Sequence, residues 1–182
     1  MTRRNSEVSL ILSAARFAAE KHRKQLRKGA DATPYINHPL EVAERIARVG
    51  GVDDAGVLAA ALLHDTIEDT ETTREELEAA FGASIAGMVA ELSDDRALSK
   101  DARKRQEIAK APGLSAGAKL IKLADKTCNV RDTLVNPPDW PLQRKLDYLD
   151  FADRIASGLG RVNPALEADF ATILADTRLK LT

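Results

Sequence analysis

The stretch AAALLHDTIEDT, at residues 59–70, joins a strongly apolar segment to a cluster of ionisable side chains. The cluster contains one imidazole and three carboxylates, at His64, Asp65, Glu68 and Asp69. Burying such a cluster is costly unless its charge is neutralised. A bound metal ion would neutralise it, and the stretch is therefore a candidate metal site.

A continuous helix would place residues four apart on the same face. We therefore predict that His64 stacks with Glu68, and Asp65 with Asp69. Imidazole nitrogen and carboxylate oxygen are both good ligands for a divalent first-row ion. His64 and Asp65 could then share one cation, while the second pair faces a water molecule. The simpler alternative is a core histidine beside a solvated helix end, and a lone His-Asp pair would favour it.

Asp125 is the strongest candidate for a further ligand. It interrupts the largely apolar pattern Leu120-Ile121-x-Leu123-Ala124, where a helix is expected to be buried. A buried acid needs a partner, and Lys122 or Arg131 could supply a structural ion pair instead of a metal. Both interpretations remain open on this evidence.

Two further histidines are candidates. His38 stands before Pro39, near the start of a predicted helix that Asn37 or His38 would cap. His22 shares a predicted helix face with small apolar residues, and nothing in the sequence excludes it as a ligand. A set of His38, His64, Asp65 and Asp125 would offer two imidazoles and two carboxylates without a thiolate. Such ligands suit Mn²⁺ or Fe²⁺, with Zn²⁺ possible and a structural zinc site disfavoured.

Composition limits the class of protein. The 182 residues suffice for one domain with a real core, and 27 basic against 28 acidic side chains create no global field for nucleic acid or an anionic membrane. No apolar run approaches the roughly 20 residues that a bilayer span needs. With one cysteine, Cys128, and no secretory signal, a cytoplasmic protein is expected.

Hydrophobic periodicity predicts an all-α chain without strands. Aromatic residues are only 4% of the chain, which favours helix packed on helix through small side chains. The charged segment 94–113 is either a mobile flank or a helix, and a solvated face is the simpler interpretation. The predicted helices lie at about residues 6–26, 38–49, 54–69, 74–81, 85–92, 115–135, 141–159 and 164–174.

Four motifs stand in order and at characteristic separations: RK at 27–28, YINHP at 35–39, LLHDTIEDT at 62–70 and KLADKxxN at 122–129. Together they resemble the HD-type hydrolase domain of RelA/SpoT-like alarmone enzymes. The resemblance is greatest to stand-alone small alarmone hydrolases and covers nearly the whole chain. It implies a compact HD-domain helical bundle, with one metal-dependent phosphohydrolase domain over residues 1–182.

The resemblance also implies a reaction and its residues. Such enzymes hydrolyse (p)ppGpp at its 3′ side to GDP or GTP and pyrophosphate. By resemblance, His22 is structural or supports a ligand without binding the metal itself. Glu68 and Asp69 are, by the same resemblance, the catalytic acids. The resemblance assigns one Mn²⁺ per chain to His38, His64, Asp65 and Asp125, and the nucleotide to Arg27, Lys28, Lys100, Asn129, Arg144 and Tyr148.

Two alternatives remain. The first is an HD phosphohydrolase acting on another phosphorylated nucleotide, such as ppApp or NADPH, because an arginine stacks on any purine. The second is an inactive alarmone-binding sensor. Retention of Glu68 and Asp69 argues against the sensor, since binding alone has little use for two acids beside a polyanion.

Overall fold

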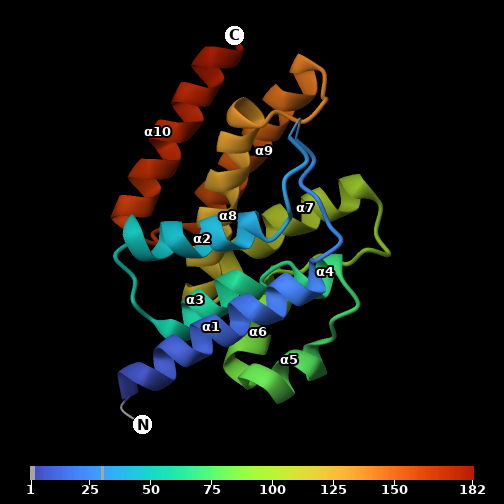
Figure 1. The fold of residues 1–182 in the computed structure, drawn as a ribbon. Coiled ribbons are helices and arrows are strands. Elements are labelled where there is room, and N and C mark those ends of the chain that lie inside the picture. The colour runs from blue at the N-terminus through green and yellow to red at the C-terminus, as the bar shows by residue number, and fades with distance from the viewer. Residues whose placement is uncertain (1–2, 30) are drawn as a thin grey trace.

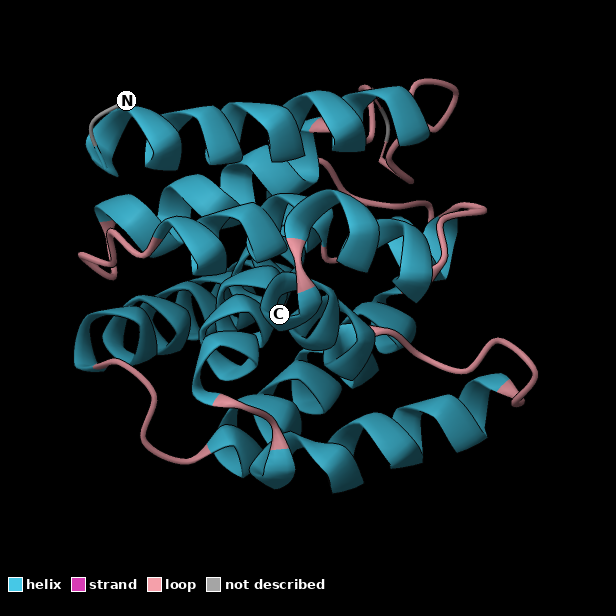
Figure 2. Cartoon of the chain, turned by 90° about the horizontal axis from the view of Figure 1, so that it is seen from below, coloured by secondary structure: helices cyan, strands magenta, loops and turns pink. Residues whose placement is uncertain are grey.

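The computed structural model describes residues 3–29 and 31–182, and its regular elements are helices (Figures 1 and 2). Within these residues no strand is present, and a single isolated bridge joins Leu26 to Pro34. The all-α prediction is confirmed. The elements are α1 (Arg3–Lys21), α2 (Asn37–Arg48), α3 (Ala55–Leu63), α4 (Thr66–Asp69), α5 (Arg74–Phe81), α6 (Ala83–Leu92), α7 (Lys100–Lys110), the 3-10 turn η1 (Ala111–Gly113), α8 (Ala116–Val135), α9 (Leu142–Leu159) and α10 (Pro164–Leu181).

Helix α3 lies at the centre of the fold, in contact with α1, α2, α6 and α8. Most of its side chains are alanine or leucine, and seven of its nine residues are buried. Alanine has the highest helix propensity and lets neighbouring helices approach closely. This burial explains why the polar residues that follow α3 enter the interior of the protein.

Helix α8 forms the second axis of the core and packs against α2, α3, α6, α9 and α10. Its middle is buried even where it carries charge, at Lys122, Asp125 and Lys126. Charged side chains are rarely buried unless they are paired. The central turn of α8 therefore marks a region that needs compensating charges.

Four helices begin close to their predicted first residues, and a side chain caps each of these four. Asp54 accepts hydrogen bonds from the backbone of Gly56 and Val57, and Thr73 accepts one from Glu76. Ser115 and Asn163 likewise cap α8 and α10. These caps satisfy backbone N–H groups that have no partner within the helix.

Three predicted helix bounds are wrong: the end of α1, the start of α2, and the end of α10, which continues to Leu181 rather than residue 174. Helix α1 ends at Lys21 rather than near residue 26, because Gln25 O accepts from Tyr35 N at 2.9 Å and residues 25–27 pair with 33–35. Helix α2 already begins at Asn37, with Ile36 as its N-cap and no side-chain cap. The first change moves the basic residues that follow α1 from a helix end into a loop.

The charged segment 94–113 contains a helix, so the alternative of a mobile flank is wrong there. Helix α7 begins after Ser99, whose hydroxyl accepts from Ala102 N. The helix is not simply a solvated face, because Glu107 is buried. None of the helices in the described part of the chain combines the length and apolar character that a bilayer span requires.

Candidate active site

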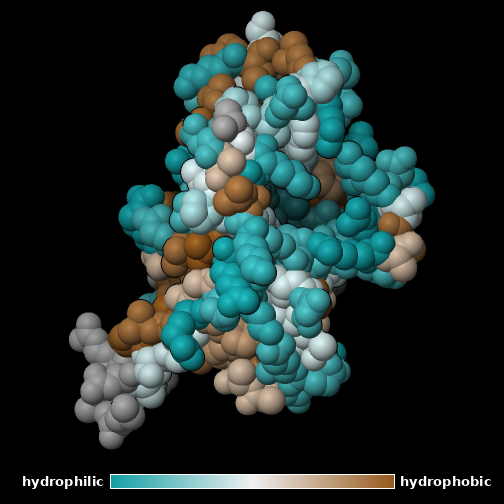
Figure 3. Space-filling model, turned by 45° about the vertical axis from the view of Figure 1, so that its right-hand side comes forward, coloured by the Kyte–Doolittle hydropathy of each residue, from teal (hydrophilic) through white to brown (hydrophobic). Residues whose placement is uncertain are grey.

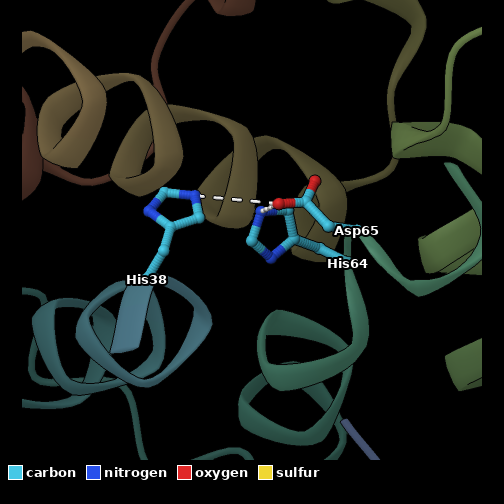
Figure 4. A group of neighbouring side chains, drawn as sticks. All are labelled: His38, His64 and Asp65. Atoms are coloured by element: carbon cyan, nitrogen blue, oxygen red, sulfur yellow. Dashed lines mark ion pairs between the residues drawn. The ribbon is translucent and has the colours of Figure 1, made fainter. Parts of the chain in front are cut away.

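Three side chains of metal-ligating type converge between α2 and the end of α3 (Figure 4). His38 comes from the first turn of α2, and His64 and Asp65 come from the residues that follow α3. One ligand atom from each lies within 4.8 Å of the others. Asp65 Oδ2 is 3.1 Å from His64 Nε2 and 3.8 Å from His38 Nε2.

Asp125 reaches the same place from α8. Its Oδ1 atom is 3.0 Å from His38 Nε2 and 3.8 Å from His64 Nε2. The fold thus brings together the four residues that the sequence analysis selected, from three separate segments. Among them His38, His64 and Asp125 are buried, and Asp65 is partly exposed.

The predicted continuous helix is wrong, because it breaks at His64 and Asp65. Helix α3 ends at Leu63, and α4 begins at Thr66, whose hydroxyl donates to Leu63 O at 2.7 Å. Asp65 has φ −95° and ψ −2°, a conformation typical of turns. The break lets the adjacent side chains of His64 and Asp65 face the same point, although they would diverge on a regular helix.

The site fits a divalent cation. His64 Nδ1 lies 2.8 Å from Ala61 O, which directs Nε2 toward the carboxylates of Asp65 and Asp125. In the described structure this buried Nε2 atom has no hydrogen-bond partner. A ring nitrogen oriented by a backbone carbonyl on its other side is the usual arrangement of a metal-ligating histidine.

Electrostatics at this cluster also favour added positive charge. Burial alone would lower the pKa of His64, but the neighbouring Asp65 carboxylate raises it to about 9. The pKa of Asp65 is lowered despite burial, because His64 and His38 stabilise its charged form. A divalent cation would supply this charge with neutral imidazole ligands.

The predicted ion-pair partners of Asp125 are wrong. Its Oδ2 atom lies 3.3 Å from Lys126 Nζ, the next residue along α8. Lys122 instead pairs with Glu107 at 3.0 Å, and Arg131 pairs with Glu41. Asp125 therefore has a lysine at one oxygen and the two histidines at the other.

His22 is not part of the ligand group. Its Nδ1 atom contacts Gln25 Oε1, and its ring lies against the Tyr35 ring with a centroid distance of 4.9 Å. His22 therefore contacts Gln25 and Tyr35 rather than the other candidate ligands.

A pocket of about 520 Å³ opens beside the ligand group. Hydrophilic side chains border a hollow on the face shown in Figure 3. The pocket lies between the loop after α1, helix α4, the C-terminal part of α8 and the N-terminal half of α9. Its lining includes Gln25, Arg27, Lys28, Tyr35, Glu68, Asp69, Asn129, Asp132, Trp140 and Tyr148.

The pocket is joined to the ligand group through Asn129. Its Nδ2 atom donates to Asp125 Oδ1 at 2.5 Å, and its Oδ1 atom accepts from Arg27 Nη2 at 2.8 Å. Arg27 also pairs with Asp132 at 2.5 Å and lies over the Tyr35 ring. Arg27 is thus held at the pocket wall by two polar partners and an aromatic face.

Further cations lie close to the pocket. The pKa of Lys100 is lowered, mainly by Arg144 and then by burial, with contributions from Lys104 and Lys28. Arg144 stacks over Trp140, with its guanidinium carbon 4.3 Å from the ring centroid. Lys100 and Arg144 stand outside the pocket lining, whereas Lys28 belongs to it. Such a group of like charges attracts a polyanion.

Glu68 and Asp69 line the pocket one turn beyond Asp65, but they point to different partners. Glu68 Oε2 accepts from Asp94 N at 3.1 Å, and Asp69 Oδ1 pairs with Arg96. Burial raises the pKa of Glu68, as do the nearby carboxylates, against the lowering effect of the Asp94 N–H. The connection between α6 and α7 therefore contacts both acids.

Sequence reasoning assigned no function to two residues that contact the ligands, or to a third that pairs with one of those two. Tyr35 donates to Asp65, Lys126 pairs with Asp125, and Glu107 pairs with Lys126. Tyr35 and Lys126 lie inside the quoted motifs, and their position there was the available signal. Glu107 lies in a highly charged segment that gives no sign of its burial.

Comparison with known proteins establishes the class. The profile of the HD domain family matches residues 14–147. The chain belongs to the HD domain family, which confirms the predicted fold. Membership of this family implies a divalent metal, and the His-His-Asp group is suited to hold one.

Particular relatives are similar over nearly their whole length. The guanosine-3′,5′-bis(diphosphate) 3′-pyrophosphohydrolase MESH1 of Xenopus tropicalis is 47% identical over 173 residues, covering 94% of this chain and 97% of the relative. MESH1 of Homo sapiens is 48% identical over 163 residues, covering 89% and 91%. A solved structure of a metazoan ortholog of SpoT that hydrolyses ppGpp has a TM-score of 0.89 at 40% identity, covering 92% of this chain and 94% of that one.

Proposed function

We propose that this chain is a metal-dependent hydrolase that cleaves (p)ppGpp at its 3′ side, releasing pyrophosphate and GDP or GTP. One observation carries the proposal: a pocket lined by three carboxylates and two cations is joined through Asn129 to Asp125, whose Oδ1 atom lies 3.0 Å from His38 Nε2. The named activity of relatives 47% and 48% identical to this chain supports the same reaction.

The proposed ligands of the metal are His38, His64, Asp65 and Asp125. We assign Mn²⁺, one per chain, because mixed nitrogen and oxygen ligands without thiolate suit it. When bound, such an ion lowers the pKa of water and polarises a phosphoryl oxygen. The fold orients the four ligands, which come from α2, the α3–α4 turn and α8.

Glu68 and Asp69 are the proposed catalytic acids. Glu68 is held by the Asp94 N–H, and its raised pKa makes its carboxylate a better proton acceptor near neutral pH. Asp69 is held by Arg96 on the other side. In this assignment Glu68 orients the attacking water and accepts its proton, and Asp69 assists in moving that proton.

The nucleotide is proposed to bind through Arg27, Lys28, Lys100, Asn129, Arg144 and Tyr148. A planar guanidinium such as that of Arg27 can stack on a purine, and the cations at Lys28, Lys100 and Arg144 suit phosphates. Asn129 can hydrogen-bond a ribose or phosphate oxygen, and Tyr148 shares the pocket lining with it. The buried thiol of Cys128 is compatible with the cytoplasm, where we place the reaction.

The test uses purified protein with Mn²⁺ and ppGpp. We expect pyrophosphate and GDP as products, and loss of turnover in His64→Ala and Asp65→Ala. No turnover by the wild type with several divalent metals, or full activity in either variant, would contradict the proposal. Parallel assays with ppApp and NADPH test the alternative substrates, and ppGpp binding without turnover would favour the sensor.

A further inference from the structure

Tyr35 connects the ligand group to the pocket. Its hydroxyl donates to Asp65 Oδ2 at 2.6 Å, and its ring lines the pocket. The same Asp65 oxygen faces His64 Nε2 at 3.1 Å and His38 Nε2 at 3.8 Å. One hydrogen bond therefore acts directly on a carboxylate oxygen that faces both imidazoles.

The Tyr35 side chain is fixed from two sides. The His22 ring packs on it at a centroid distance of 4.9 Å, and the Arg27 guanidinium carbon lies 5.6 Å from its centroid. The backbone is fixed as well, because Tyr35 N donates to Gln25 O and Tyr35 O accepts from His38 N. A donor held this firmly can determine the orientation of its acceptor.

The chemistry of the acceptor permits this role. Each carboxylate oxygen has two lone pairs, so Asp65 Oδ2 can accept from Tyr35 and still bind a cation. The phenol is the donor of this bond, because an ionised carboxylate can only accept.

We propose that Tyr35 is a positioning residue that orients Asp65 for metal binding. This inference rests on the proposed function only in taking Asp65 as a metal ligand. A hydrogen bond to a ligating carboxylate fixes its direction, and removing such partners typically lowers metal affinity roughly 10- to 100-fold. Tyr35 itself is not expected to contact the ion or the reacting atoms.

Tyr35→Phe tests the inference, because it removes the hydroxyl and keeps the ring that contacts His22 and Arg27. The Kd for Mn²⁺, measured by calorimetry without nucleotide, should rise roughly 10- to 100-fold. Saturating Mn²⁺ should restore most of the turnover of ppGpp. A purely structural role would not give this dependence on Mn²⁺ concentration.

The matched control is Tyr148→Phe, which alters the other tyrosine of the chain. Tyr148 lines the same pocket, and no hydrogen bond joins it to the described ligand group. Its substitution should leave the Kd for Mn²⁺ within about twofold of the wild type. An unchanged Kd in folded Tyr35→Phe, or an equal loss in both variants, would overturn the inference.

A second measurement serves if Tyr35→Phe does not fold. In Tyr148→Phe protein labelled with 3-fluorotyrosine, Tyr35 is the single fluorine reporter. Adding diamagnetic Zn²⁺ should shift its ¹⁹F resonance, and an unchanged resonance at saturating Zn²⁺ would overturn the inference. Both readouts omit nucleotide, so failure of ppGpp hydrolysis with an intact Tyr35 effect would contradict the proposed function alone.

Discussion

Glu107 Oε1, on α7, lies 2.8 Å from Lys126 Nζ, on α8, in the interior of the protein. The same oxygen lies 3.0 Å from Lys122 Nζ. Since Lys126 also pairs with Asp125, one buried carboxylate of α7 supports the charged centre of α8. Burial would raise the pKa of Glu107, but the two lysines outweigh it and lower that pKa to about 2.

This buried pair predicts a pH-dependent stability. Because the pKa of Glu107 is lower in the folded protein than its ordinary 4.5, its stabilising contribution is complete above pH 4.5 and is lost as the pH falls toward 2. Glu107→Gln should lower the free energy of unfolding by about 3 kcal/mol at pH 7, since it leaves buried Lys122 without a counterion and Lys126 with Asp125 alone. The deficit should shrink between pH 5 and pH 3.

Urea unfolding of both proteins at pH 7, 5 and 3 measures this difference. Glu44→Gln is the control, because Glu44 forms an exposed pair with Arg48 and should change stability by less than about 1 kcal/mol. A deficit that stays constant from pH 7 to pH 3 would show that the charge of Glu107 does not stabilise the fold.

The N-cap of α3 predicts a smaller effect on stability. Asp54 Oδ1 accepts from Gly56 N at 2.8 Å and from Val57 N at 3.0 Å. Asp54→Ala should cost about 1 kcal/mol, which corresponds to a fall in Tm of roughly 2–4 °C for a chain of this size. The neighbouring Asp53→Ala should stay within about 0.5 kcal/mol of the wild type in calorimetry. Equal losses in the two variants would argue against the cap.

The proposed roles of the two acids predict a separation of turnover from metal binding. Glu68→Gln and Asp69→Asn should each lower kcat for ppGpp by roughly 10²- to 10⁴-fold, the range for general acid–base groups. Their Mn²⁺ content should match the wild type, because neither is a proposed ligand. Loss of Mn²⁺ together with activity would instead make them ligands.

The position of Arg27 predicts an effect on substrate binding. Arg27 is held by Asn129 and Asp132 at the pocket wall, and its guanidinium plane is suited to stack on a purine. Arg27→Ala should raise the KM for ppGpp at least about tenfold, and Arg27→Lys should not restore it, since lysine lacks the planar group. Steady-state kinetics of the two variants decide the point, and full recovery in Arg27→Lys would reduce its role to charge alone.

Local signals predicted much of this fold. The caps at Asp54, Thr73, Ser115 and Asn163 act within a few residues, so the sequence around each one contains the needed information. The end of α1 was not predictable in this way, because it depends on pairing of residues 25–27 with residues 33–35.

In the candidate site, too, residue types were predictable and tertiary contacts were not. The residue types suggested His38, His64, Asp65 and Asp125 as ligands but left His22 open, and the resemblance decided between them. The fold brings the four residues together. The break after Leu63 was not predicted, because the residue pattern there is helical throughout. The contact that accompanies the break, from the Thr66 hydroxyl to Leu63 O, is visible only in the structure. Glu107 was missed because only tertiary packing shows that α7 turns this carboxylate inward.

The central claim is that four residues from α2, the α3–α4 turn and α8 hold one metal ion. The most direct test is a crystal structure of protein loaded with Mn²⁺, with anomalous diffraction data at the manganese edge and elemental analysis of the same sample. We predict one manganese per chain and one anomalous peak bounded by His38, His64, Asp65 and Asp125. No peak at these residues in fully loaded protein, or a peak bound elsewhere, would contradict the claim.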